Sequence, residues 1–338
     1  FIARYRKEWT GSLDEVQIRE IERLVKYHRL LEERKIAILE SIEKQGKLTD
    51  ELKEKITVCE KLQELEDLYL PYKPKKRTRA TIAKEKGLEP LADKIMDEAS
   101  PEKYALEFVN EEKGVKNIEE ALQGAMDIVA ERVSEEAEIR SFTRDAALKK
   151  GILEVKAKDM KAGSEFEMYK EYSEPVSQIK HHRVLAINRG EEVKELSVKL
   201  EFPDEFILMN MKHYFIIEEN RFIVMAIEDS YKRLLKPSIE REVRNTLTEK
   251  AEAQAIEVFS QNLKKLLMQA PLKGFIVMGV DPGIRTGTKF AIMNKHGEFL
   301  SYGLFYQEKL ELAAQIIKDA VEKNKVEIIA IGNGTASR

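Results

Sequence analysis

One aspartate has the setting that metal chemistry requires. Asp281 follows the apolar run 274–280 and precedes the tight turn Pro282-Gly283. A carboxylate at the end of a buried strand is a candidate ligand for Mg²⁺, and two such ions can hold a phosphodiester for hydrolysis. That chemistry needs several Asp or Glu oxygens from separate strands and helices. The sequence supplies Asp281 as a candidate catalytic and metal-binding residue, without a clear second ligand.

A segment rich in lysine and arginine could bind phosphate groups. Residues 71–87 contain seven cations and one acid, Glu85, whereas the whole chain has 58 Lys and Arg against 61 Asp and Glu, a formal net charge of −3. Tyr69 and Tyr72 flank the segment, and aromatic rings beside basic side chains suit stacking on single-stranded nucleic acid. We predict a phosphate-binding loop; an exposed charged connection is the alternative. The candidate nucleic-acid-binding residues are Lys73, Lys75, Lys76, Arg77, Arg79, Lys84 and Lys86.

A helix-turn-helix unit is predicted further along the chain. Amphipathic helices over 117–133 and 135–150 precede two predicted strands, 152–155 and 167–169, which are joined by a polar loop. Helix, helix and hairpin is the layout of a winged helix-turn-helix. The second helix also displays Arg140 and Arg144, which are further candidates for nucleic-acid contact. Because acidic residues alternate with them, a packing or protein-protein module is the alternative.

Helices are also predicted on either side of these segments. Apolar residues recur at helical spacing over 14–44, and a second helix over 49–69 would form an antiparallel hairpin with it. Pro237 is expected in the first turn of one continuous helix that runs to residue 270 and connects domains. Its length would be about 50 Å at ~1.5 Å per residue. A strand is predicted over 193–202.

After Pro271 the pattern changes to short strands separated by turns. An antiparallel three-strand meander, a crossover helix and a parallel fourth strand form the opening half of a ribonuclease H-like fold. The fourth strand should lie beside the first and bring the hydroxyls of Thr335 and Ser337 near Asp281, where they could bind phosphate. An actin-like ATPase shares such an opening and is the competing interpretation. The predicted elements are strands 275–280, 288–294 and 299–305, a helix over 309–323 and a strand over 326–331.

Composition limits the remaining classes. Charged residues make up 35% of the chain, with only 16 glycines and 9 prolines, which favours long solvated helices over an all-β fold. Cys59 is the only cysteine, so no intrachain disulfide can form and a reducing cytoplasm is the expected location. No apolar run approaches the ~20 residues of a membrane-spanning helix. Because the chain begins with Phe1 and ends just after a predicted strand, we expect both ends to be cut.

Several motifs spread along the whole chain resemble the bacterial Tex family of transcription accessory factors. The resemblance is specific because the motifs are long and occur near both ends and in the middle. They are Phe1-Ile2-Ala3-Arg4-Tyr5-Arg6-Lys7-Glu8, Leu68-Tyr69-Leu70-Pro71-Tyr72-Lys73-Pro74-Lys75-Lys76-Arg77-Thr78-Arg79, Asn110-Glu111-Glu112-Lys113-Gly114, Asp281-Pro282-Gly283 with Arg285-Thr286-Gly287, and Ile331-Gly332-Asn333-Gly334-Thr335-Ala336-Ser337-Arg338.

The resemblance implies a helical N-terminal region with a helix-turn-helix unit, followed by a YqgF domain similar to the RuvC resolvase. It also implies a helix-hairpin-helix domain and an OB-fold RNA-binding domain, both outside this sequence. The implied partners are RNA or DNA, bound mostly through those further domains, and RNA polymerase or other transcription machinery. No membrane partner is implied.

Two departures from the family pattern affect the expected chemistry. The link from Tyr306 to Gln307 is shorter than the proline-rich connection of the family, so residues are expected to be absent there. The family also places a glutamate just beyond Ser337-Arg338, and this is the natural second metal ligand. Because Asp281 alone cannot hold two metal ions, the resemblance favours a scaffold over a nuclease.

We therefore predict a mainly α-helical chain with a C-terminal α/β module. The expected parts are a helical N-terminal region (1–113), a helix-turn-helix-like unit (114–175), a mixed segment with a long helix (176–270) and a partial YqgF domain (274–338). The predicted function is that of a transcription accessory factor that binds DNA or RNA without sequence specificity and acts as a scaffold. The alternatives are a Mg²⁺-dependent RuvC-like nuclease using Asp281 and a pure protein-interaction scaffold. Mg²⁺ is expected as a cofactor only under the nuclease alternative.

Overall fold

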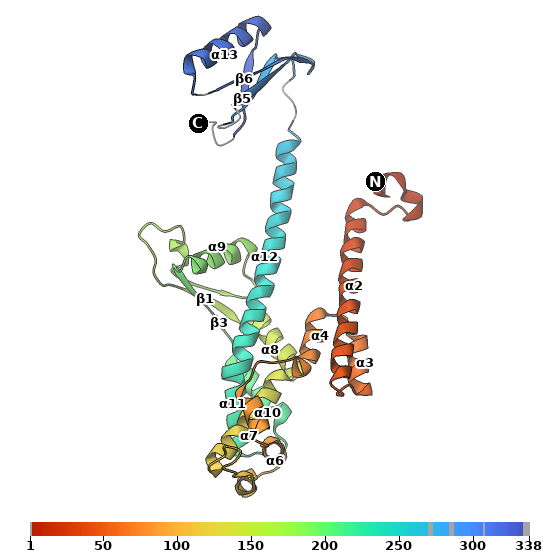
Figure 1. The fold of residues 1–338 in the computed structure, drawn as a ribbon, viewed down its shortest axis with the longest axis vertical. Coiled ribbons are helices and arrows are strands. Elements are labelled where there is room, and N and C mark those ends of the chain that lie inside the picture. Colours follow the sequence, from red (N-terminus) through yellow and green to blue (C-terminus); the bar gives the residue numbers. More distant parts are fainter. Residues whose placement is uncertain (1, 270–272, 284–286, 307, 334–338) are drawn as a thin grey trace. The chain divides into compact units, whose positions relative to one another are not determined.

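The chain forms a mainly helical unit up to Glu257 and a smaller α/β unit from Val258 on (Figure 1). A computed structural model describes residues 2–269, 273–283, 287–306 and 308–333. The prediction of a mainly α-helical chain with a C-terminal α/β module is confirmed. No helix within these ranges is long and apolar enough to cross a membrane.

The N-terminal helices pack around a small apolar core. After α1 (Ile2–Tyr5) and a 3₁₀ turn (Lys7–Trp9), α2 (Glu15–Lys44) begins at a capping box formed by Asp14 and Gln17. The prediction of one continuous helix over 49–69 is wrong, because the segment forms two helices, α3 (Asp50–Val58) and α4 (Leu62–Tyr69). The Tyr27 hydroxyl holds the break by donating to Glu60 O and accepting from Leu62 N. The core side chains are Leu31, Ile38, Ile42, Ile56, Cys59, Leu65 and Tyr69.

Helix α7 (Ile118–Glu135) lies at the centre of the largest core. It packs against α5 (Arg79–Glu85), α6 (Glu89–Asp97) and α11 (Arg221–Asp229). The approach of α7 to the turn before α6 is close, because a Cβ added to Gly124 would lie 2.4 Å from Leu88 Cδ1. Short 3₁₀ turns occupy Leu70–Tyr72, Pro101–Lys103 and Ala105–Phe108.

A single residue, Glu136, separates α7 from α8 (Ala137–Lys150), and a three-stranded antiparallel sheet follows. The sheet has the order β2-β1-β3, and α9 separates its last two strands in the sequence. The predicted strand over 167–169 is wrong: these residues form a 3₁₀ turn whose Tyr169 packs into the core of this module, and β2 follows it. The helix-turn-helix assignment stays a prediction. The bounds are β1 Ile152–Ala157, β2 Glu171–Pro175, β3 Leu196–Glu201 and α9 His181–Glu192.

The predicted long helix is confirmed as α12 (Lys236–Leu267), but its start is not where Pro237 suggested. After α10 (Asp204–Phe215), helical backbone runs from α11 through a π-helix, Ser230–Leu235, directly into α12. A proline inside an α-helix loses a hydrogen bond and its ring meets the carbonyl four residues earlier. The wider π turn just before Pro237 removes that conflict, so the proline sits within a continuous helix.

The C-terminal unit has the predicted order of strands and helix. Its sheet runs β6-β5-β4-β7, in which β4 and β7 are parallel and the other neighbours antiparallel. The predicted pairing of the first and fourth strands is therefore confirmed. Helix α13 packs on one face through Ile316 and Ala320, against Met278, Phe290 and Ile292 of the sheet. The bounds are β4 Val277–Asp281, β5 Thr288–Met293, β6 Phe299–Phe305, α13 Leu310–Asn324 and β7 Ile328–Ile331.

Candidate nucleic-acid interface

The basic segment 71–87 lies against the C-terminal part of α7. It leaves the 3₁₀ turn at Tyr72, runs in extended form and becomes α5 at Arg79. Thr78 caps α5, because its hydroxyl accepts a hydrogen bond from Thr81 N, and it also donates to Glu131 on α7 at 3.0 Å. A side chain on α7 therefore fixes where α5 begins.

Two of the predicted phosphate-binding lysines are already neutralised by α7. Lys75 forms ion pairs with Glu135 and with Glu131, whose Oε2 lies 3.5 Å from its Nζ. Lys84 reaches the same Glu131 oxygen at 3.6 Å. Burial raises the pKa of Glu135 above its ordinary value, and the charge of Lys75 opposes this rise. These two lysines attach the segment to the fold.

The remaining cations of the segment are more accessible. Arg77 pairs with Glu85 at 2.8 Å, but both side chains are well exposed, and such pairs contribute little. Lys73, Lys76 and Arg79 are exposed and form no ion pair within the part of the chain that the structure describes. We call these three residues the exposed strip. The seventh predicted cation, Lys86, is half-buried and donates a hydrogen bond to Gly114 O at 2.8 Å. The structure thus separates attached lysines from accessible cations within the segment.

Arg140 and Arg144 do not face solvent, and the prediction that they contact nucleic acid is not supported. Arg140 is 4% exposed, and its Nε donates to Asp67 Oδ1 at 2.9 Å. Arg144 donates to Asp67 Oδ2 at 2.7 Å and to Glu242 Oε2 at 2.9 Å, and Arg140 also pairs with Glu242. Burial works against the charge of Arg144, but these carboxylates keep its pKa above the ordinary value. The network ties α4, α8 and α12 together.

The carboxylate partners of these basic residues were missed in the sequence. Glu131 and Glu135 stand four apart on α7, a spacing that puts both on one helical face and could have marked an acidic site. Asp67 and Glu242 lie far from Arg140 in sequence, and nothing in the local pattern pairs them. Long-range ion pairs of this kind become visible only in the fold.

Asp281 stands where the sequence predicts, at the end of β4 beside the end of β7. Gly332 N donates to Val280 O at 2.8 Å, and a Cβ added to Gly332 would lie 3.8 Å from Asp281 Oδ1. The predicted approach of the turn after β7 is thus confirmed as far as Gly332. The motif residues Arg285 and Thr286, the hydroxyls of Thr335 and Ser337, and the junction at Gln307 lie outside the described residues.

The residues around Asp281 do not fit a two-metal site. Asp281 is exposed, and its neighbour across the sheet is a cation, Lys289. Both line a hollow of about 480 Å³ with Tyr302 and Leu304. No group of three Asp, Glu, His or Cys side chains that could hold a metal ion occurs within the described ranges. One carboxylate opposite a lysine is a poor donor set for Mg²⁺.

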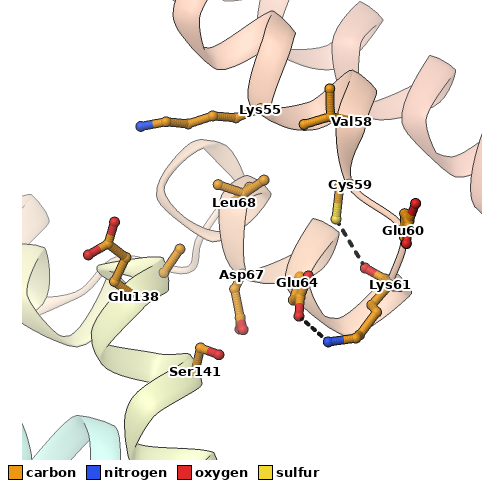
Figure 2. A pocket seen from close by; sticks show the side chains of 11 residues that line it. Lys55, Val58, Cys59, Glu60, Lys61, Glu64, Asp67, Leu68, Glu138 and Ser141 are labelled. Atoms are coloured by element: carbon orange, nitrogen blue, oxygen red, sulfur yellow. Dashed lines mark hydrogen bonds and ion pairs between the residues drawn. The ribbon is translucent and has the colours of Figure 1, made fainter.

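A second hollow of about 480 Å³ lies between α3, α4 and α8 (Figure 2). Figure 2 shows Glu138 and Ser141 of α8 facing side chains from the other two helices. Its charged groups are largely satisfied: Lys61 pairs with Glu64 at 2.7 Å, and the Cys59 thiol donates to Lys61 O at 3.3 Å. Asp67 belongs to the buried arginine network described above. The hollow therefore offers no nucleophile beside a base.

Family models match three successive parts of the chain. They are the Tex-like protein N-terminal domain over residues 1–43, the Tex central region-like model over 96–259 and the Tex protein YqgF-like domain over 275–338. Together the three matches cover most of the sequence, and the third coincides with the four-stranded α/β unit.

Relatives align with the full length of this chain. The Bacillus subtilis protein YdcI is 46% identical over 352 residues, and the chain covers 49% of it. The transcriptional accessory protein Tex of Neisseria gonorrhoeae is 38% identical over 351 residues, with 46% of it covered. A human protein named for an S1 RNA-binding domain is 30% identical over 360 residues, with 36% of it covered. The chain spans about half the length of the bacterial relatives. With matches to the N-terminal, central and YqgF-like models in their order along the sequence, the chain belongs to the Tex family.

Proposed function

We propose that this chain is part of a transcription accessory factor that binds RNA or DNA without sequence specificity, through the exposed strip Lys73, Lys76 and Arg79. The observation that carries the proposal is the contrast, within the basic segment, between lysines that pair with α7 and exposed cations that do not. Lys75 and Lys84 are held by Glu131 and Glu135, whereas Lys73, Lys76 and Arg79 are exposed and form no ion pair among the described residues. Cations placed in this way are free to replace the counterions of a phosphate backbone.

Sequence independence follows from the chemistry of the strip. Lysine and arginine side chains that meet phosphates fix the position of a nucleic acid without reading its bases. A formal net charge of −3 gives the chain no general attraction for polyanions, so affinity has to come from such a local group. We further propose that the helical unit serves as a scaffold for RNA polymerase or other transcription machinery, in keeping with the name of the gonococcal relative.

The test is the fluorescence anisotropy of labelled single-stranded RNA and DNA 20-mers across a salt series. The variant carries Lys73→Glu, Lys76→Glu and Arg79→Glu. Loss of three phosphate contacts on a single strand should lower affinity roughly 100-fold at 0.1 M salt and reduce the salt slope by about 2. Unchanged affinity in this variant would contradict the proposal and favour a pure protein-interaction scaffold.

A matched control carries the same change of charge at a different exposed site. Lys158→Glu, Lys161→Glu and Lys170→Glu replace three exposed lysines that form no ion pair among the described residues. Affinity in this control should fall by only a few-fold through the altered net charge. An equal loss in both variants would show that total charge, and not the strip, determines binding.

A nuclease is the second candidate, favoured by the position of Asp281 beside Gly332 at the strand ends. Asp281→Asn separates the two functions, because it removes a metal ligand and leaves the exposed strip intact. Under the proposed function the variant binds as the wild type does and neither protein cleaves nucleic acid with Mg²⁺. Cleavage by the wild type that disappears in the variant would establish the nuclease instead.

A further inference from the structure

A pocket of about 410 Å³ lies next to the exposed strip and has no assigned role. Its walls come from three places that are distant in sequence: α5, the turn at Gly114 and the first half of α7. The turn belongs to the Asn110–Gly114 motif, which closes on itself through backbone hydrogen bonds between Asn110 and Val115. The motif therefore contributes to the wall of a pocket as well as to the fold.

The charges in this pocket are unequally satisfied. Its cations are Arg79, Lys86 and Lys116, none of which forms an ion pair among the residues that the structure places. Of its two acids, Asp127 is 12% exposed and pairs with Arg233 at 3.1 Å. The other, Glu120, accepts a hydrogen bond from the backbone N of Lys116 at 3.0 Å. Burial raises the pKa of Asp127, and the charges of Arg233 and of the pocket residue Arg79 oppose this rise. Lys86 and Lys116 are therefore the pocket cations that remain without a carboxylate partner in an ion pair among the described residues.

A fourth cation, Lys113, lies at the turn next to the pocket residue Gly114. Gly87 and Gly114 both have positive φ, at 82° and 75°, and each directly follows a lysine. A Cβ added to Gly87 would lie 3.6 Å from Lys113 Nζ, and one added to Gly114 would lie 3.6 Å from Lys86 Cε. Lys86 Nζ donates only to an uncharged carbonyl, Gly114 O, at 2.8 Å. Lys86 and Lys113 thus lie at adjoining turns and form no ion pair among the described residues, so both ammonium groups can donate to an anion such as phosphate.

We propose that this pocket binds one phosphate group of a nucleic-acid backbone, held by Lys86, Lys113 and Lys116. Arg79 lines the pocket and also ends the exposed strip, so a strand that follows Lys73 and Lys76 reaches the pocket without a break. The volume accommodates a phosphate with its sugar, while the bases remain outside and unread. The inference rests on the proposed function and adds a defined site to it.

The test uses a variant that leaves the exposed strip untouched. Lys86→Gln, Lys113→Gln and Lys116→Gln remove charge but keep a polar side chain at each position. For a single-stranded RNA 20-mer, loss of one phosphate contact should weaken binding roughly 5-fold at 0.1 M salt and lower the salt slope by about 0.7. The control with Gln at Lys158, Lys161 and Lys170 should change affinity less than 3-fold. Wild-type affinity in the pocket variant, with loss in the strip variant, would overturn this inference and leave the proposed function standing.

A second measurement keeps the result independent of folding defects in the triple variant. Acetylation of the wild-type lysines is followed by mass spectrometry, alone and with the RNA 20-mer, inorganic tripolyphosphate or polyglutamate. Protection of Lys86, Lys113 and Lys116 by RNA is the expected result. Protection by tripolyphosphate but not by RNA would mean that the pocket takes free phosphate, which overturns this inference and leaves the proposed function standing. Protection by polyglutamate alone would identify an acidic peptide as the ligand, and protection by none would overturn the pocket itself.

Discussion

The two groups of basic residues in the helical unit differ in what surrounds them. Arg140 and Arg144 lie inside the fold, where Asp67 and Glu242 take up their charge. The exposed strip lies on the surface, and its Lys76 directly follows Lys75, which pairs with two glutamates of α7. Basic residues therefore stabilise the fold in one region and remain available to a ligand in the other. The carboxylates nearby decide which role each cation has.

The largest effect is expected from removing the acid at the centre of the buried network. Asp67→Asn leaves two buried guanidinium groups short of a partner, and breaking a buried pair in this way costs about 3–5 kcal/mol. Urea unfolding followed by circular dichroism measures the loss. At low urea, where the variant is still folded, RNA affinity should equal that of the wild type. A parallel fall in affinity and stability would mean that the two groups of cations are not separate.

An exposed aspartate provides the control for that substitution. Asp145 pairs with Lys149 at 2.9 Å on the surface of α8, and both side chains are more than half exposed. Asp145→Asn should change the free energy of unfolding by less than about 0.5 kcal/mol. A cost comparable to that of Asp67→Asn would show that the buried position of the arginine network is not what makes it strong.

The next effect comes from releasing the lysines that α7 holds. Glu131→Gln with Glu135→Gln keeps the hydrogen-bond acceptor for Thr78 but removes the charges that pair with Lys75 and Lys84. Two freed cations should raise affinity for single-stranded RNA roughly 5- to 25-fold at 0.1 M salt. Anisotropy titration measures this gain. If affinity stays constant, Lys75 and Lys84 do not lie on the path of the strand.

A smaller effect follows from the pKa of Glu135. Burial, helped by the charge of Glu131, holds this pKa above the ordinary 4.5, although Lys75 and Lys84 oppose the rise. As pH falls through the raised pKa, Glu135 becomes neutral in the fold while the unfolded chain remains ionised, so the fold gains stability relative to the unfolded state. Lys75 then keeps only its ion pair with Glu131, so RNA affinity should rise between pH 7.5 and pH 5 by less than the roughly 5-fold expected for one fully freed cation. Glu135→Gln should remove this part of the pH dependence.

The smallest effect is expected at the exposed pair of Arg77 and Glu85. Glu85→Gln frees Arg77 from a partner that solvent already screens. Affinity should rise no more than about 2-fold, and the thermal unfolding midpoint should stay within about 1 °C, as is usual for a surface substitution that changes little free energy. A gain in affinity as large as that from Glu131→Gln and Glu135→Gln would show that Glu85 neutralises Arg77 as strongly as α7 neutralises Lys75 and Lys84.

Elements with strong local signals were predictable from the sequence. The periodicity of α2 and α12 and the alternation in the C-terminal strands gave their existence and order, and the parallel pairing of β4 with β7 followed from the crossover helix. The failures arose where distant contacts override local preference. The break between α3 and α4 depends on Tyr27, and the burial of Arg140 depends on Asp67 and Glu242. The sequence within a few residues of these positions does not indicate these distant partners.

The π-helix at Ser230–Leu235 also determines the direction in which the side chains of α12 face around the helix axis. One extra residue in a helical turn rotates the downstream side chains by about 100° relative to an uninterrupted α-helix, since each residue advances that far around the axis. Ile239 and Val243 are fully buried and Glu242 pairs with Arg140 and Arg144. In an uninterrupted α-helix these three side chains would face a direction about 100° away. The π-helix thus lets α11 and α12 form one continuous helix while each turns its own apolar side chains toward the core.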